Sequence, residues 1–133
     1  MKKLIPVVGT LALIGVTAWL ITRESPYEWD LPPDVPPPAV PTDNPMSAAK
    51  VELGRWLLYD KRLSGNETMS CASCHIQALA FTDGKPRSIG STGEIHPRSS
   101  MSLVNVAYAS RLTWANPLLD RLEDQAVTPL LGD

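Results

Sequence analysis

Five consecutive residues, Cys71-Ala72-Ser73-Cys74-His75, constrain this chain more than any other feature of its sequence. The spacing C-x-x-C-H is typical of covalent attachment of c-type haem. On a helical turn, residues three apart share one face, so both thiols can meet the vinyl edges of one porphyrin. His75 then offers its imidazole to the iron, which leaves one axial position to be filled. We therefore expect one covalent haem c per chain, held by Cys71, Cys74 and His75.

Other sites also use paired cysteines, namely zinc half-sites, disulfides and redox dithiols. Zinc needs two further Cys or His ligands at suitable spacing, and His96 is the sole other candidate in the sequence. A thioredoxin-like dithiol needs a βαβ context, and the sequence shows no alternating strand pattern. Because both cysteines of the chain fall inside the motif, haem attachment is the favoured interpretation.

The first segment, residues 1–24, reads as a membrane anchor or an export signal. Two lysines precede an uncharged apolar run, residues 4–22, which is long enough to span a bilayer as a helix. The lysines should stay in the cytoplasm, which places the rest of the chain outside it. A cleaved signal peptide is the alternative, but Ala18-Trp19-Leu20 is a poor cleavage site. We expect an uncleaved anchor in the inner membrane of a Gram-negative bacterium, with a periplasmic haem domain.

A proline-rich linker, residues 25–45, follows with 8 of the chain's 13 prolines. This composition excludes helix and favours polyproline II. Two interpretations stay open at this point. The linker either holds the haem domain off the membrane as a stiff spacer, or lies along the domain surface through Tyr27, Trp29 and Leu31.

The remaining residues, 46–133, are predicted to form an all-α, cytochrome c-like haem domain. Asn44-Pro45 is a good helix start, and Ala49, Leu53, Trp56 and Leu57 then form an apolar stripe, with Trp56 in the core. Further helices are predicted over residues 70–78, 101–109 and 118–131, with a long loop over residues 82–100. Nine basic and nine acidic side chains balance in this domain, so nucleic acid is not an expected partner.

The segment LGRWLLYDKRLSGNETMSCASCHIQALAFTDGKPRSIG, residues 53–90, resembles the first haem domain of bacterial di-haem cytochrome c peroxidases and MauG-like proteins. SLVNVAY, LTW and LEDQAVTPL continue the resemblance in order through residues 102–130. The resemblance implies that hydrogen peroxide reacts at the first haem, while a second haem in a later domain supplies electrons. Within this family, the sequence most resembles the subgroup associated with methanobactin gene clusters, in which a tryptophan of a partner protein is oxidised.

The resemblance also implies roles for single residues. Trp114 matches a position that relays electrons between the two haems, and a plain core tryptophan is the alternative. Gln125 and Pro129 match positions of the distal pocket, and Phe81 is expected to pack on the haem. Ser91 follows the S-I-G motif, where many members carry an iron-ligating histidine. The resemblance therefore implies a distal side that is open without reductive activation.

Three departures from the family pattern bear on function. The distal glutamate of the family would fall just past Asp133, and a second C-x-x-C-H does not occur in the sequence. Ser99 follows Arg98 where the family often has an asparagine that serves calcium, so calcium is not an expected cofactor. The chain therefore resembles the first portion of a longer enzyme, whose partners are a second haem domain or chain and a periplasmic electron donor or substrate protein.

The alternative function is a membrane-tethered, mono-haem electron-transfer protein with both axial positions filled. Such a carrier needs a sixth ligand to the iron, and Met69, His96 and Met101 are the candidates. Met69 is poorly placed because it lies just before Cys71. His96 lies in the long loop before Pro97, where a solvated histidine is the favoured interpretation.

Overall fold

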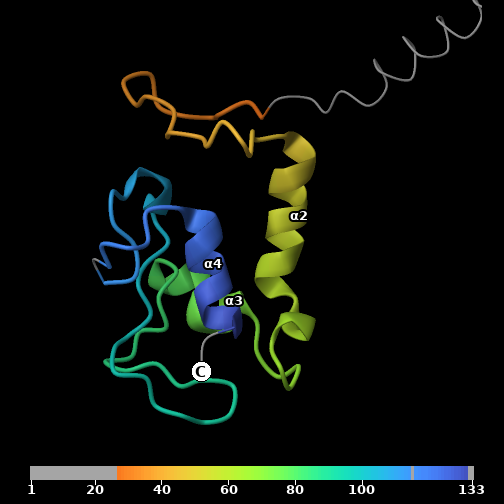
Figure 1. Ribbon diagram of the computed structural model, residues 1–133, viewed down its shortest axis with the longest axis vertical. Coiled ribbons are helices and arrows are strands. Elements are labelled where there is room, and N and C mark those ends of the chain that lie inside the picture. Colours follow the sequence, from red (N-terminus) through yellow and green to blue (C-terminus); the bar gives the residue numbers. More distant parts are fainter. Residues whose placement is uncertain (1–26, 115, 132–133) are drawn as a thin grey trace, which may run out of the picture.

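The computed structural model describes residues 27–114 and 116–131, and within these ranges it is a loop-rich helical structure. The elements in chain order are α2 (Ala48–Tyr59), η1 (Lys61–Leu63), α3 (Cys71–Cys74), η2 (Gln77–Leu79), η3 (Val106–Tyr108) and α4 (Leu122–Leu131). α2 runs along one side of the structure, and long loops run along the other (Figure 1). The described residues contain helices and isolated bridges but no strand, so the expected helical class is confirmed, with a modest helical content.

The first described helix, α2, begins three residues later than the sequence predicted. Ser47 caps it in an extended conformation, and its hydroxyl accepts the N–H of Lys50 at 3.3 Å. Asn44, the predicted cap, instead donates its amide N–H to the carboxylate of Glu123 at 2.8 Å. Asn44 therefore ties the start of α2 to α4.

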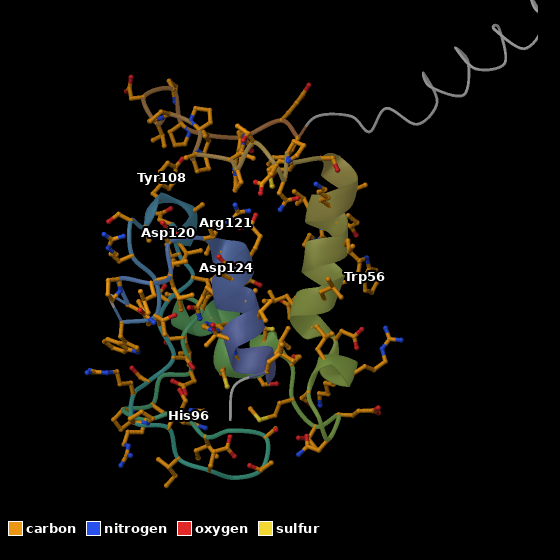
Figure 2. The ribbon with its side chains drawn as sticks, in the orientation of Figure 1. Trp56, His96, Tyr108, Asp120, Arg121 and Asp124 are labelled. Atoms are coloured by element: carbon orange, nitrogen blue, oxygen red, sulfur yellow. The ribbon has the colours of Figure 1, made fainter. Side chains whose placement is uncertain are left out.

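The apolar stripe of α2 is exposed among the described residues. Trp56 is 70% exposed and Leu53 is 57% exposed. The indole of Trp56 points away from α4 (Figure 2) and donates Nε1–H to Glu52 at 3.0 Å. The prediction that Trp56 lies in the core is therefore wrong, because this side of α2 has no packing partner among the described residues.

The described residues bury very little apolar surface on their own. Of their large apolar side chains, Leu112 alone is buried, with 3% exposed. A helical domain of this size normally buries a continuous apolar cluster, so these side chains need a further apolar body to pack against.

The two helices predicted around the middle of the chain are largely replaced by turns. The predicted helix over residues 70–78 is divided, because the backbone of His75 leaves helical geometry between α3 and η2. The predicted helix over residues 101–109 is reduced to η3. Ser102 accounts for much of this change, since its hydroxyl donates to the carbonyl of Ala80 and accepts the N–H of Val104.

The last helix, α4, begins at Leu122 rather than near residue 118. Asn116 holds the preceding residues in a turn, because its side chain accepts the N–H of Leu118 at 3.0 Å. Residues 82–100 form the predicted long loop. Its outer part folds back as a hairpin, in which Ile89 bridges Ile95.

The proline-rich linker contacts the haem domain where the structure describes it. The Tyr108 hydroxyl donates to the carbonyl of Pro36 at 2.8 Å, and Arg121 pairs with Asp43 at 3.1 Å. Pro38 is buried. Figure 1 shows this segment in orange at one end of the structure. These contacts are those expected if the linker lies along the domain surface.

The predicted anchor, residues 4–22, lies outside the described residues. Within the described ranges, no helix is both long and apolar enough to cross a membrane.

Candidate haem site

One short helical turn carries the residues of the C-x-x-C-H motif. Ser70 precedes α3 with an extended backbone, and its N–H donates to the hydroxyl of Ser73 at 3.0 Å. At the other end, the N–H of His75 donates to the carbonyl of Cys71 at 2.9 Å. Both cysteines are free thiols and are half-buried, as is His75. The structure thus brings the three residues together on one turn.

The imidazole of His75 is held by a backbone carbonyl. Its Nδ1 lies 2.9 Å from the carbonyl oxygen of Phe81. A carbonyl oxygen only accepts hydrogen bonds, so Nδ1 carries a hydrogen, and in the neutral imidazole Nε2 is then the nitrogen with the lone pair. This is the tautomer in which Nε2 can ligate a metal, and the hydrogen bond makes the imidazole a stronger electron donor.

The carbonyl of Phe81 is presented by a tight loop, residues 76–82. Ile76 and Thr82 pair at its base, where the Ile76 N–H donates to the Thr82 carbonyl at 3.0 Å. Ala80 and Phe81 both have left-handed backbones, with φ of 54° and 58°. Such conformations cost about 1–3 kcal/mol each and persist where surrounding contacts determine them. The carbonyl that holds His75 is therefore presented by a strained segment of backbone.

A buried polar cluster lies beside Cys74. Asp83 and Ser88 are 6% and 7% exposed, and the hydroxyls of Ser88 and Ser100 lie 2.8 Å apart. Burial raises the pKa of the Cys74 thiol, and its hydrogen bond with Ser100 partly opposes this. Sequence reasoning missed Asp83 and Ser100, although a T-D-G turn just after the motif was a usable signal.

The carboxyl group of Asp83 is charged at neutral pH. Burial raises its pKa, but the nearby Ser88 hydroxyl and the backbone N–H groups of Lys85 and Ser100 outweigh burial. The net result is a pKa below the ordinary value of 3.8. The Lys85 N–H donates to Asp83 Oδ1 at 3.1 Å, while Oδ2 is buried with no hydrogen-bond partner among the described residues.

Trp114 stands outside any core that the described residues form. Its side chain is 48% exposed, and its backbone is left-handed with φ of 54°. The indole Nε1–H donates to the carbonyl of Ser99 at 3.2 Å. Among the described residues, Trp114 is therefore held by the loop and is half-exposed.

Gln125 and Pro129 lie one turn apart on α4. Pro129 has no N–H, so it cannot give the usual helical hydrogen bond to the carbonyl of Gln125. The side-chain oxygen of Gln125 is also buried, with no hydrogen-bond partner among the described residues. The side chain of Gln125 therefore offers a buried acceptor on this turn of α4.

Two of the three candidates for a sixth ligand, His96 and Met101, make other contacts in the structure. His96 lies on the outer part of the long loop (Figure 2), with Nε2 3.5 Å from the Glu94 carboxylate. Met101 has its sulfur 2.9 Å from the backbone nitrogen of Trp114. Ser91 accepts a hydrogen bond at its carbonyl from the side chain of Asn66 at 2.6 Å.

The residues present fit haem c. The two thiols and the imidazole nitrogen share one turn, which is the donor set that covalent haem attachment requires. The exposed apolar side chains of α2 and α4 supply surface that an apolar macrocycle can cover, among them Leu57, Leu122 and Leu130. The fold and site thus define a c-type haem protein.

Comparison with known proteins identifies its family. Residues 48–133 match the di-haem cytochrome c peroxidase family, and the chain belongs to it. It is 48% identical over 98 residues to cytochrome-c peroxidase IdrP1 of Denitromonas iodatirespirans, covering 74% of this chain and 26% of that protein. It is 30% identical over 129 residues to methylamine utilization protein MauG of Methylophilus methylotrophus, covering 97% of this chain and 37% of that protein.

A solved structure shows the same fold. It is that of a MauG-like protein associated with microbial copper homeostasis, with a TM-score of 0.76 and 57% sequence identity. The match covers 80% of this chain and 30% of that one. The fold is thus that of MauG-like cytochrome c peroxidases, and membership in this family implies haem c as cofactor. The chain spans about a quarter to a third of the length of these relatives.

Proposed function

We propose that the chain is the first haem-binding part of a periplasmic di-haem oxidoreductase that reacts with hydrogen peroxide. The observation that carries the proposal is the turn of α3, where His75 is fixed by Phe81 with Nε2 free beside two half-buried cysteines. Haem c, when bound, supplies the redox-active iron at which peroxide is reduced. The family match and the cytochrome c peroxidases among the relatives support this assignment.

Each residue of the site has a role in the proposal. Cys71 and Cys74 hold the haem through thioether bonds, and His75 is the proximal ligand. The ring of Phe81 packs on the haem while its carbonyl orients His75. On the distal side, the buried amide oxygen of Gln125 accepts a hydrogen bond from the bound substrate.

The distal side of the iron stays open to peroxide. Ser91 occupies the position at which many relatives carry a ligating histidine, and a neutral hydroxyl competes poorly with water for ferric iron. The carbonyl of Ser91 is also tied to Asn66, which fixes this part of the loop. The contacts of His96 with Glu94 and of Met101 with Trp114 support the same proposal.

The partner in turnover is a second haem, in a later domain or another chain. Trp114 relays electrons between the two, and its exposed position on the loop surface supports this role. The chain is 57% identical to a MauG-like protein, and its resemblance to the MauG-like subgroup is the reason for proposing a partner protein as the oxidised substrate. We place the haem domain in the periplasm, anchored to the inner membrane through residues 4–22.

Optical spectroscopy of the haem-loaded protein tests the proposal. Adding stoichiometric hydrogen peroxide to the ferric protein should change the haem spectrum without prior reduction. Ser91→His should block this reaction until the protein is reduced, whereas Ser91→Ala should react like the wild type. A ferric protein that is inert to peroxide, with a six-coordinate low-spin spectrum, would instead support the mono-haem electron carrier.

A further inference from the structure

One short segment of the chain, residues 98–101, contacts Trp114 and holds it in place. The guanidinium carbon of Arg98 lies 5.2 Å from the centre of the Trp114 ring. The carbonyl of Ser99 accepts the indole Nε1–H at 3.2 Å, and the backbone nitrogen of Trp114 lies 2.9 Å from the sulfur of Met101. One segment therefore contacts the face of the indole, its polar edge and its backbone.

The backbone at Trp114 shows that this placement is imposed. Thr113 and Trp114 have φ of 47° and 54°, which is unusual for a β-branched and a bulky residue. A tight turn holds them, since Asn116 donates its N–H to the carbonyl of Leu112 at 2.8 Å. Strain of this kind persists only where surrounding contacts determine the conformation, and it gathers at functional sites.

The charge over the ring has a direct chemical consequence. A guanidinium over the face of an indole is attracted by the electrons of the ring. If the indole loses one electron, it becomes positively charged, and that attraction turns into repulsion. Arg98 therefore stabilises the neutral indole relative to its oxidised form.

We propose that Arg98 is a positioning residue that holds the Trp114 indole and makes its one-electron oxidation less favourable. Strong oxidants can then remove an electron from Trp114, whereas weak oxidants cannot. The inference rests on the proposed function, because it sets how strong an oxidant must be before the relay at Trp114 can pass an electron.

The same loop supplies a matched control. Arg87 is exposed and donates its Nε–H to the carbonyl of His96 at 2.8 Å, across the hairpin from Arg98. Removing its charge changes the local net charge by the same amount as removing that of Arg98. The two variants therefore separate the stacked cation from the general electrostatics of the loop.

Photo-oxidation of the haem-loaded protein tests the inference without peroxide. Illuminated ruthenium tris-bipyridine with persulfate yields ruthenium(III), which takes one electron from an indole and returns to ruthenium(II). The oxidised indole then loses its Nε1 proton to water. Mass spectrometry of peptides compares oxidation of Trp114 with that of Trp56, an internal reference that is 70% exposed.

Arg98→Gln and Arg98→Met should each raise the ratio of Trp114 to Trp56 oxidation by about 2- to 5-fold, which corresponds to an exposed cation–π contact of about 0.5–1 kcal/mol. The Met variant keeps the ring face covered, so greater exposure does not explain its rise. Arg98→Lys should stay within about 2-fold of the wild type, and Arg87→Gln should leave the ratio unchanged.

An unchanged ratio in both uncharged Arg98 variants would overturn the inference, as would an equal rise in Arg87→Gln. If one of the two variants does not fold, the other decides. The relay itself is tested separately, by the effect of Trp114→Phe on the peroxide reaction. A relay that fails there leaves the photo-oxidation result intact.

Discussion

The imidazole Nδ1 of His75 lies 2.9 Å from the carbonyl oxygen of Phe81, six residues further along the chain. The contact joins two elements of different character, the end of a helical turn and a strained loop. It fixes the tautomer of the proposed proximal ligand, and it depends on a backbone that only certain residues can adopt.

Substitutions at Phe81 should separate its backbone from its ring. Phe81→Gly accepts the left-handed backbone and keeps the carbonyl, so the His75 contact should persist. Phe81→Pro cannot adopt φ of 58° and loses the N–H that bonds Ile76, so the contact should be lost and stability should fall by more than about 1 kcal/mol. Resonance Raman spectroscopy of the ferrous protein should show a lower iron–histidine stretching frequency in the Pro variant alone. Equal frequencies in both would show that the carbonyl does not tune His75.

Haem should be bound covalently through both cysteines. After denaturation and extraction with acidic solvent, wild-type protein should keep its haem on the polypeptide. Cys71→Ala and Cys74→Ala should each keep one thioether, with a shifted pyridine haemochrome spectrum, and the double variant should release its haem. Release of haem from the wild type would refute the assignment of the motif.

Some of this site could be predicted from the sequence, because its signals are local. The C-x-x-C-H spacing identifies Cys71, Cys74 and His75 without knowledge of the fold. The partner of His75 could not be found in this way, because any residue can offer a backbone carbonyl. The left-handed pair Ala80 and Phe81 that presents it carries neither glycine nor asparagine, so the usual signal of such a turn is missing.

The predicted ends of the helices differ from the observed ends for a related reason. Ser102 and Asn116 use their side chains to bond nearby backbone groups, which ends or delays helices that apolar spacing alone would extend. Trp56 was misplaced because periodicity identifies an apolar stripe but not what covers it.

The buried carboxylate of Asp83 should stabilise the domain in a pH-dependent way. Its pKa is lower in the folded protein, so its contribution is complete above the ordinary value of 3.8 and is lost as the pH falls through the folded value. Asp83→Asn should lower the free energy of unfolding by about 1–2 kcal/mol at pH 7. The difference between wild type and variant should shrink at pH 3.

Urea unfolding followed by circular dichroism at both pH values measures this effect. Asp34→Asn is the control, because Asp34 is an exposed aspartate of the linker, and it should unfold like the wild type at either pH. A constant difference between wild type and Asp83→Asn at pH 7 and pH 3 would contradict the role of the charge.

The linker should detach from the domain when its contacts are removed. Tyr108→Phe loses the hydrogen bond to Pro36, which is worth about 0.5–1.5 kcal/mol. Arg121→Gln loses the pair with Asp43, whose pKa the Arg121 guanidinium lowers. Limited proteolysis should cut residues 27–43 faster in the double variant, and Tyr59→Phe on α2 should not change the rate. Equal rates in all variants would show that these contacts do not hold the linker.

The sixth coordination position decides between the two functions, and single substitutions can identify its occupant. Three side chains are candidates for the sixth ligand of an electron carrier, and two of them contact other groups in the structure. His96 faces Glu94, and the sulfur of Met101 faces the backbone of Trp114. If neither ligates the iron, the ferric protein should be high-spin, and its spectrum should be the same in His96→Ala and Met101→Ala. A low-spin ferric spectrum that becomes high-spin in either variant would identify that residue as the ligand. Such a result would refute the open site and favour the electron carrier.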